Sequence, residues 1–192
     1  EPLLLGFNRF DKLLNLVNEL SERTNCKIRQ SMTTNGTLLN DGWIKLLEEN
    51  DVGVTISIDG PTENFNRRRI YQNGRGSFEK VKNGLFLVKS SRIRLGCLVV
   101  ADPTSDPDEL LAGMVEGLGL KSFDVLIPKI NYDQKERGHY LPIGRFFADL
   151  FHTWYSKYSY RGIKIRICTD LVALLLGKTD YATTVSGGRM TH

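Results

Sequence analysis

The sequence predicts an α/β fold organised around a sheet of parallel strands, either open or closed into a barrel. Three observations favour this class. Apolar, strand-like runs alternate with amphipathic stretches of helical spacing, the alternation returns about every 30 to 35 residues, and no repeat, low-complexity tract or linker interrupts it. Active sites in such folds gather at the carboxyl ends of the strands, so the residues there are the functional candidates.

The first elements are a helix, a strand and a second helix. Phe10–Arg23 carries apolar residues at helical spacing, and the short run Cys26–Thr33 that follows reads as a strand. Leu38–Asn50 repeats the helical pattern, and either Asn40 or Asp41 is placed to cap its start.

The next elements bracket a long polar loop. Val52–Ile58 is a β-branched run typical of a strand buried on both faces, and the loop Asp59–Gly76 follows it. Ser77 is placed to cap a helix over Phe78–Lys89, and Ile93–Ala101 supplies another strand.

The second half of the chain continues the alternation. We expect a helix over Asp108–Gly117, a strand over Ser122–Pro128 and, after a polar loop, a long aromatic helix over Ile143–Tyr158. Gly162–Ile167 is a short strand-like segment, and Asp170–Gly177 is a helix that ends at its glycine.

Composition excludes several classes of protein. The chain has 192 residues, of which 41% are hydrophobic and 25% charged, as in an ordinary soluble domain. Its longest apolar runs, such as Leu171–Leu176, are far too short to span a bilayer, and no signal segment opens it, so we expect a cytoplasmic protein without a membrane partner. The net charge is +4, and the densest basic cluster, Arg67–Arg69, is too short for a nucleic-acid interface.

Several familiar catalytic patterns are missing. Cys26, Cys97 and Cys168 lie far apart without metal-site spacing and read as buried or free thiols. No histidine has the context of a hydrolytic triad. Gly74–Ser77 opens a helix and could bind an anion, but it lacks the glycine spacing and the Lys-Ser/Thr ending of a phosphate-binding loop, which favours a plain helix-start turn.

Polar residues at the predicted strand ends suit ligand binding. Ser57 and Asp59 alternate along one strand and would project to the same side, where they could bind a ribose diol or an amino-acid moiety. Capping of the following turn is an equally good interpretation of Asp59. One arginine of Arg67–Arg69 could pair with a carboxylate, whereas the others read as a solvated basic loop.

Four motifs taken together resemble a known family. They are, in order, Glu1-Pro2, TTNGTLLN (Thr33–Asn40), VTISIDGP (Val54–Pro61) and RIYQNGRGSFEKVKNGL (Arg69–Leu85). Their order and spacing resemble the radical S-adenosylmethionine (SAM) enzymes, especially the peptide-modifying branch with a cysteine-rich SPASM extension. IRICTDLVALLLGK (Ile165–Lys178) is similar to the segment that leads into that extension in maturases that cross-link peptide side chains.

The resemblance implies the fold and its limits. Residues 1–160 would form a partial (β/α)6 TIM-like barrel of parallel strands, the radical SAM core, incomplete at its N-terminus. Glu1-Pro2 would be the last half of the Gly-Gly-Glu-Pro tetrapeptide that ends the second barrel strand, so the C-x-x-x-C-x-x-C motif for a 4Fe-4S cluster would precede the excerpt. Residues 161–192 would connect to a C-terminal SPASM-type extension outside this chain.

The resemblance also implies which residues bind SAM. Glu1 would bind the methionyl amino group, and Thr34 and Asn35 would line the site. Ser57 and Asp59 would hold the methionyl carboxylate or the ribose, and Arg69 would pair with that carboxylate. Val100 and Leu126 would flank the adenine. None of the residues is expected to bind a metal, because the cluster ligands would lie outside the chain.

The implied chemistry is the cleavage of SAM to a 5′-deoxyadenosyl radical that abstracts hydrogen from a ribosomally made peptide or protein. An electron donor such as a flavodoxin or ferredoxin would be a further partner. Asp133, directly after the sixth strand, is the candidate catalytic base, although shaping a turn is its simpler interpretation. Two alternatives stay open: a TIM-like barrel enzyme that binds a phosphorylated metabolite, and a non-catalytic peptide-binding barrel fragment.

Overall fold

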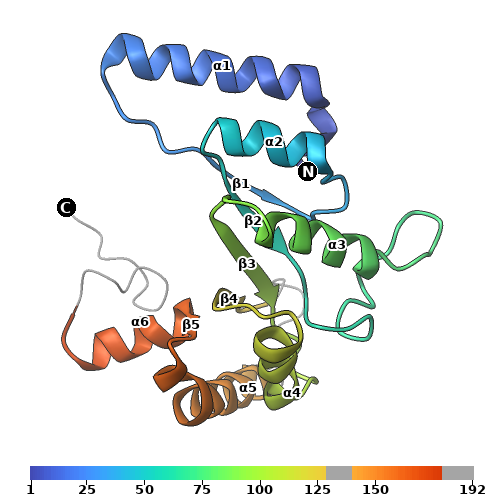
Figure 1. Cartoon of the computed structure of the whole chain (residues 1–192). Coiled ribbons are helices and arrows are strands. Elements are labelled where there is room, and N and C mark those ends of the chain that lie inside the picture. Colours follow the sequence, from blue (N-terminus) through green and yellow to red (C-terminus); the bar gives the residue numbers. More distant parts are fainter. Residues whose placement is uncertain (129–139, 179–192) are drawn as a thin grey trace. The chain divides into compact units, whose positions relative to one another are not determined.

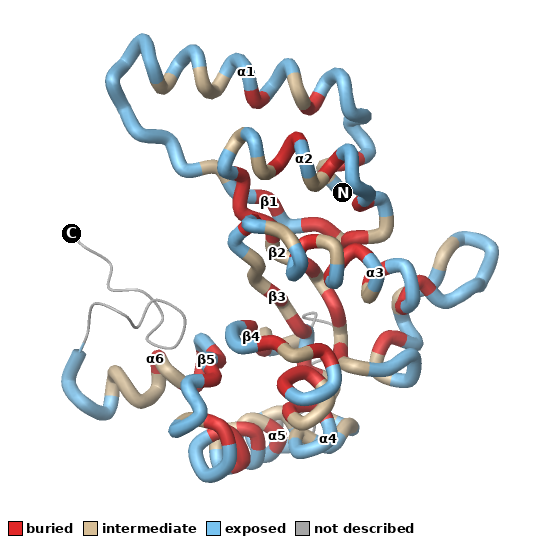
Figure 2. Tube along the Cα trace, viewed as in Figure 1, coloured by how far each residue is buried: buried red, intermediate tan, exposed pale blue. Residues whose placement is uncertain are grey.

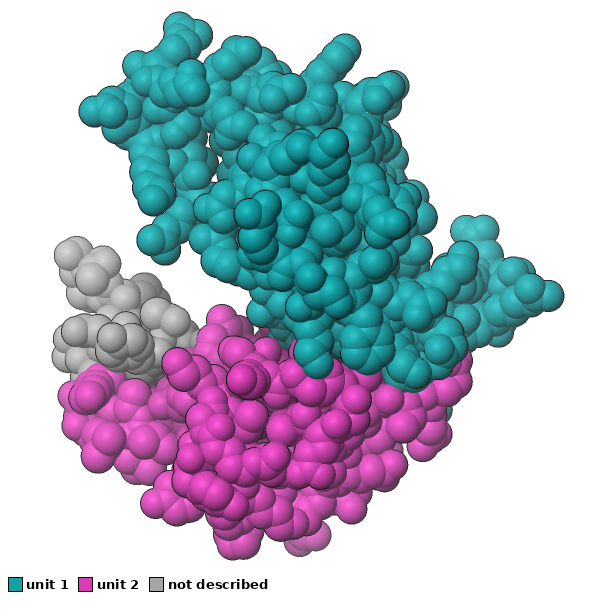
Figure 3. Space-filling view, in the orientation of Figure 1, with its two compact units in different colours: residues 1–58, 66–97 teal, residues 59–65, 98–192 magenta. Residues whose placement is uncertain are grey.

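The computed structural model describes residues 1–128 and 140–178 (Figure 1). The chain folds into two compact units, residues 1–58 with 66–97 and residues 59–65 with 98–192 (Figure 3). Its strands form a sheet in the order β1-β2-β3-β4-β5. The pairs β1–β2, β3–β4 and β4–β5 are parallel, which confirms the predicted α/β class with a parallel sheet.

The first unit contains three helices and two complete strands. In chain order its elements are a 3-10 turn at Pro2–Leu5, α1 (Phe7–Thr24), β1 (Ser31–Thr34), α2 (Asp41–Glu49), β2 (Gly53–Ser57) and α3 (Phe78–Lys89). The three helices lie where the sequence predicts them. The strand predicted over Cys26–Thr33 begins only at Ser31, because its partner β2 begins at Gly53, the residue paired with Ser31.

The helix starts in this unit show how each cap works. Asn40, not Asp41, caps α2: its side chain accepts a hydrogen bond of 3.1 Å from the Trp43 N–H. Ser77 stands at the N-cap position of α3, but the predicted side-chain cap is wrong. The Ser77 hydroxyl instead donates to the Arg69 carbonyl at 2.9 Å, because the loop before α3 folds back onto it.

One face of the β1–β2 pair is buried and the other carries hydroxyls. Val54 and Ile56 are buried, and α3 packs against β2 with Val81 and Leu85 also buried (Figure 2). Successive side chains on a strand point to opposite faces, so Thr55 and its register partner Thr33 lie on the other face. The helices therefore cover the apolar face and leave a polar one.

Two glycines let α3 approach the turn that follows β1. A Cβ atom added to Gly84 would lie 2.2 Å from the carbonyl oxygen of Gly36, far inside any normal contact. Gly36 itself has φ of 73°, the left-handed region that glycine adopts most easily. The Asn35-Gly36 turn is therefore fixed against the helix by the absence of side chains.

The second unit begins within β3. Its elements are β3 (Leu95–Val100, which crosses from the first unit), α4 (Pro107–Ala112), β4 (Ser122–Leu126), α5 (Tyr140–Thr153), β5 (Lys164–Ile165) and α6 (Arg166–Leu175). Helices α4 and α5 continue as π-helical turns at Gly113–Gly117 and Trp154–Tyr158. The main difference from prediction is at α6, which begins at Arg166 and not at Asp170, so the predicted strand-like segment keeps only the two residues of β5.

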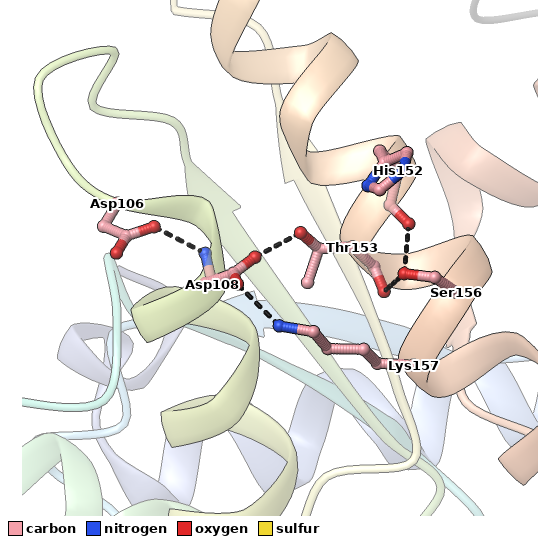
Figure 4. Close-up of polar contacts among 6 residues, drawn as sticks. All are labelled: Asp106, Asp108, His152, Thr153, Ser156 and Lys157. Atoms are coloured by element: carbon pink, nitrogen blue, oxygen red, sulfur yellow. Dashed lines mark hydrogen bonds and ion pairs between the residues drawn. The ribbon is translucent and has the colours of Figure 1, made fainter.

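A polar network joins α4 to α5 and the turn after it (Figure 4). The Asp108 carboxylate accepts hydrogen bonds from the Thr153 hydroxyl and from Lys157 Nζ, the latter at 2.6 Å. Asp106 caps α4 by accepting from the Asp108 N–H at 2.9 Å. The hydrogen bonds from Lys157 and then Thr153 hold the pKa of Asp108 below its ordinary value of 3.8.

This network makes a small part of the stability depend on pH. A lowered carboxyl pKa stabilises the folded state fully above the unfolded-state value and loses that contribution as pH falls through the folded-state value. We expect Asp108→Asn to unfold at lower temperature than the wild type at about pH 6 and the gap to shrink towards about pH 2. Thermal unfolding at several pH values measures it, and a gap that stays constant would mean that the carboxylate charge contributes nothing.

Among the described residues, no helix is both long and apolar enough to cross a membrane. The predicted division at residue 160 between barrel and connector stays a prediction.

Candidate functional site

The Glu1 carboxylate is held at the carboxyl end of β1. Its Oε1 accepts hydrogen bonds from the Thr34 hydroxyl at 2.6 Å and from the Leu3 N–H at 3.4 Å, and its Oε2 accepts from the Asn35 N–H at 2.8 Å. A carboxylate offers about four lone-pair directions, so this one keeps capacity for a further donor. Glu1, Thr34 and Asn35, which the sequence places in one site, do come together.

Asn35 connects this carboxylate to a pocket. Its side-chain oxygen accepts from both the N–H and the hydroxyl of Thr37, at 3.0 and 2.8 Å, which fixes the turn. A pocket of about 210 Å³ opens beside the turn, lined by Asn35, Thr37, Arg69, Ile70, Tyr71, Ser77 and Val81. Arg69 and Asn35 thus line the same pocket within one compact unit.

The hairpin that carries Arg69 is closed by backbone hydrogen bonds. Ile70 and Gly76 form an antiparallel bridge, and the N–H groups of Gly74 and Ser77 donate to the carbonyls of Tyr71 and Arg69. The Arg75 N–H donates to the Asn73 side chain. Because these N–H groups already have acceptors inside the hairpin, Gly74–Ser77 is a poor phosphate cradle, in agreement with the helix-start interpretation.

The other predicted cofactor residues lie at or just beyond strand ends. Ser57 is the last residue of β2 and is half-buried, and Asp59 stands in the loop after it. In the second unit Val100 and Leu126 are register partners on β3 and β4, and Val100 is 42% exposed. These two apolar side chains therefore lie on the same face of the sheet, and their role beside the adenine stays a prediction.

Sequence reasoning missed a charged pair in the second unit. Asp124 on β4 is only 6% exposed, and its Oδ2 accepts two hydrogen bonds from the Arg166 guanidinium. Its Oδ1 accepts from the Ile167 N–H at 3.3 Å, so Asp124 also caps the start of α6. The sequence feature that could have revealed this pair is an aspartate inside the otherwise apolar strand Ser122–Leu126.

Two of the three thiols, those of Cys97 and Cys168, are unsuited to binding a metal. Burial raises the pKa of Cys97 and of Cys168 to about 12 each, so both stay protonated, and Cys26 is exposed. Residues 1–128 and 140–178 hold no group of three His, Cys, Asp or Glu side chains placed to bind a metal ion. The described residues therefore do not fit a 4Fe-4S cluster, and the predicted catalytic residue Asp133 lies outside them.

Comparison with known proteins defines the class of this chain. The model of the radical SAM superfamily matches residues 2–112, which is more than half of the chain. The chain belongs to the radical SAM superfamily, whose members use SAM with an iron–sulfur cluster.

Comparison with individual proteins narrows the similarity within this superfamily. The chain is 30% identical over 192 residues to a cysteine-type anaerobic sulfatase-maturating enzyme of Clostridium perfringens (94% of this chain, 50% of the relative) and 26% identical over 194 residues to that of Clostridium novyi (97% and 52%). A solved structure described as native anSMEcpe with bound AdoMet and Kp18Cys peptide matches with a TM-score of 0.81 and 28% identity, over 94% of this chain and 52% of that one. The chain therefore spans about half the length of these relatives.

Proposed function

We propose that the protein containing this chain is a radical SAM maturase that modifies a side chain of a ribosomally made peptide or protein. The observation that carries the proposal is the match, at a TM-score of 0.81 over 94% of the chain, to a sulfatase-maturating enzyme with bound AdoMet and a peptide. A phosphometabolite enzyme is less well supported, because the hairpin uses the N–H groups that would cradle a phosphate.

The first unit fits the methionyl end of SAM. An α-amino acid presents an ammonium group and a carboxylate, and the unit offers a partner for each. The Glu1 carboxylate has acceptor capacity left after its hydrogen bonds to Thr34 and Asn35. Arg69 lines the adjoining pocket and supplies a planar cationic donor for the carboxylate.

The remaining contacts are proposed from the same resemblance. Ser57 and Asp59 would bind the carboxylate or the ribose, and Val100 and Leu126 would flank the adenine. When bound to a reduced 4Fe-4S cluster, SAM supplies a 5′-deoxyadenosyl radical for hydrogen abstraction. The residues of this chain bind and orient SAM, and we expect the cluster ligands in the rest of the protein.

The proposed partners are a peptide substrate and an electron donor of the flavodoxin or ferredoxin type. We propose that the protein acts in the cytoplasm and binds neither nucleic acid nor a membrane.

The complete protein with reconstituted cluster and a reductant tests the proposal. We expect it to cleave SAM to 5′-deoxyadenosine and methionine and to change the mass of an added cysteine- or serine-containing peptide. A protein that binds its cluster but leaves SAM intact would contradict the proposal.

Asp133 is proposed to act on the substrate and not on SAM. A positioned carboxylate could take the proton released as a substrate radical is oxidised. In the complete enzyme, Asp133→Asn should lower peptide modification at least about tenfold, roughly 1.4 kcal/mol in the barrier, and leave SAM cleavage without peptide nearly intact. Loss of both activities together, or unchanged product formation, would remove Asp133 from the substrate site.

A further inference from the structure

Tyr71, in the hairpin before α3, has a buried side-chain hydroxyl. The oxygen is inaccessible to solvent, and no hydrogen-bond partner for it exists among residues 1–128 and 140–178. Burying a hydroxyl without a partner costs free energy, so such groups in native structures call for an explanation. A bound ligand is one explanation.

The hairpin fixes the backbone of Tyr71, and Lys80 contacts its ring. Its backbone N–H donates to the Arg75 carbonyl at 2.9 Å, and its own carbonyl accepts from the Gly74 N–H at 2.9 Å. Lys80 Nζ lies 5.6 Å from the centre of the Tyr71 ring, in the range of a cation–π contact. A tyrosine whose backbone is already fixed loses less freedom when a ligand binds than one in a flexible loop.

The pocket beside it is suited to an anion. Tyr71 lines the pocket of about 210 Å³ together with Arg69, Asn35 and Thr37, and none of its lining residues is acidic. Ser77, at the N-terminus of the 12-residue helix α3, also lines it, and a helix N-terminus carries partial positive charge. The Thr37 and Ser77 hydroxyls already donate to Asn35 and to the Arg69 carbonyl, so the groups that favour a carboxylate here are the Arg69 guanidinium, the Tyr71 hydroxyl and the helix dipole.

We propose that Tyr71 is a positioning residue for SAM, whose hydroxyl donates a hydrogen bond to the methionyl carboxylate that Arg69 pairs with. This inference rests on the proposed function and deepens it. A phenol hydroxyl donates one directed hydrogen bond, so Tyr71 adds direction to the contact. The carboxylate then receives donors from two residues of one hairpin, Arg69 and Tyr71.

Tyr71→Phe in the complete, cluster-loaded enzyme is the test, since it removes the oxygen and keeps the ring. We expect the Kd for SAM, measured by calorimetry, to rise about 10- to 100-fold, as for losing a hydrogen bond to a charged group. Without SAM the variant should unfold at the wild-type temperature or above, because a buried unpaired hydroxyl is gone. Decarboxylated SAM should bind wild type and variant equally.

Tyr155→Phe, at a tyrosine that is 62% exposed in the second unit, is the matched control and should change nothing. A lower unfolding temperature with an unchanged Kd would show that the hydroxyl has a structural partner and would overturn the inference. If Arg69→Ala weakens SAM binding and Tyr71→Phe does not, the inference fails while the proposed function stands. A wild-type enzyme that binds no SAM would contradict both the inference and the proposed function.

Discussion

Replacing Arg69 by alanine in the complete enzyme is expected to weaken SAM binding by roughly 30- to 1000-fold, or about 2 to 4 kcal/mol. Arg69 lines the pocket beside Asn35, and a guanidinium can donate two parallel hydrogen bonds to one carboxylate. Removing it takes away both bonds and the charge. Equilibrium binding of SAM to the cluster-loaded protein measures the effect.

Arg67→Ala is the matched control, two residues earlier on the same loop. Arg67 is exposed and does not line the pocket, so its loss should change the Kd less than about threefold, the size of a surface charge contribution. Equal effects of the two substitutions would mean that the loop acts as a diffuse basic surface. Arg69→Lys should restore only part of the affinity, because an ammonium group lacks the planar fork.

The helices were the elements that the sequence predicted best. In α1, α2 and α3 the apolar positions recur at helical spacing, and local pattern is enough to place such helices within a few residues. The errors in the prediction concern element boundaries that are determined by a residue distant in the sequence. β1 starts at Ser31 because β2 offers no partner before Gly53, and α6 starts at Arg166 because Asp124, 42 residues earlier, meets its first turn.

The candidate site, too, was predictable only where a local motif marks its residues. The Thr-Asn-Gly turn and the arginine after the Asp-Gly-Pro motif were recognisable as motifs, and the structure brings Glu1, Thr34 and Asn35 into hydrogen-bond contact. Tyr71 was not recognisable, because an aromatic residue in a polar hairpin reads as exposed. Its hydroxyl is buried in the folded hairpin, and no local pattern in the sequence encodes that burial.

The contact between Gly84 and Gly36 links stability to this site. Gly84→Ala would place a methyl group 2.2 Å from the Gly36 carbonyl oxygen and 3.0 Å from its carbonyl carbon, and backbone atoms cannot swing aside as a flexible side chain can. Either α3 or the Asn35-Gly36 turn must move. Overpacking of this kind costs about 3 kcal/mol, so we expect a clear fall in the free energy of unfolding, measured in urea.

The direction of movement predicts a second effect. If the turn moves, the Asn35 N–H leaves its 2.8 Å hydrogen bond to Glu1, and the SAM affinity of the folded variant should fall as well. Gly144→Ala, at an exposed position of α5, is the control. Nothing lies within 4 Å of the added methyl group, so the protein should gain about 0.5 to 1 kcal/mol of stability from alanine's higher helix propensity. Opposite signs for the two Gly→Ala substitutions are the expected outcome. A Gly84→Ala protein as stable as the wild type would contradict the prediction, because it would mean that the space between α3 and the Gly36 carbonyl accommodates a methyl group.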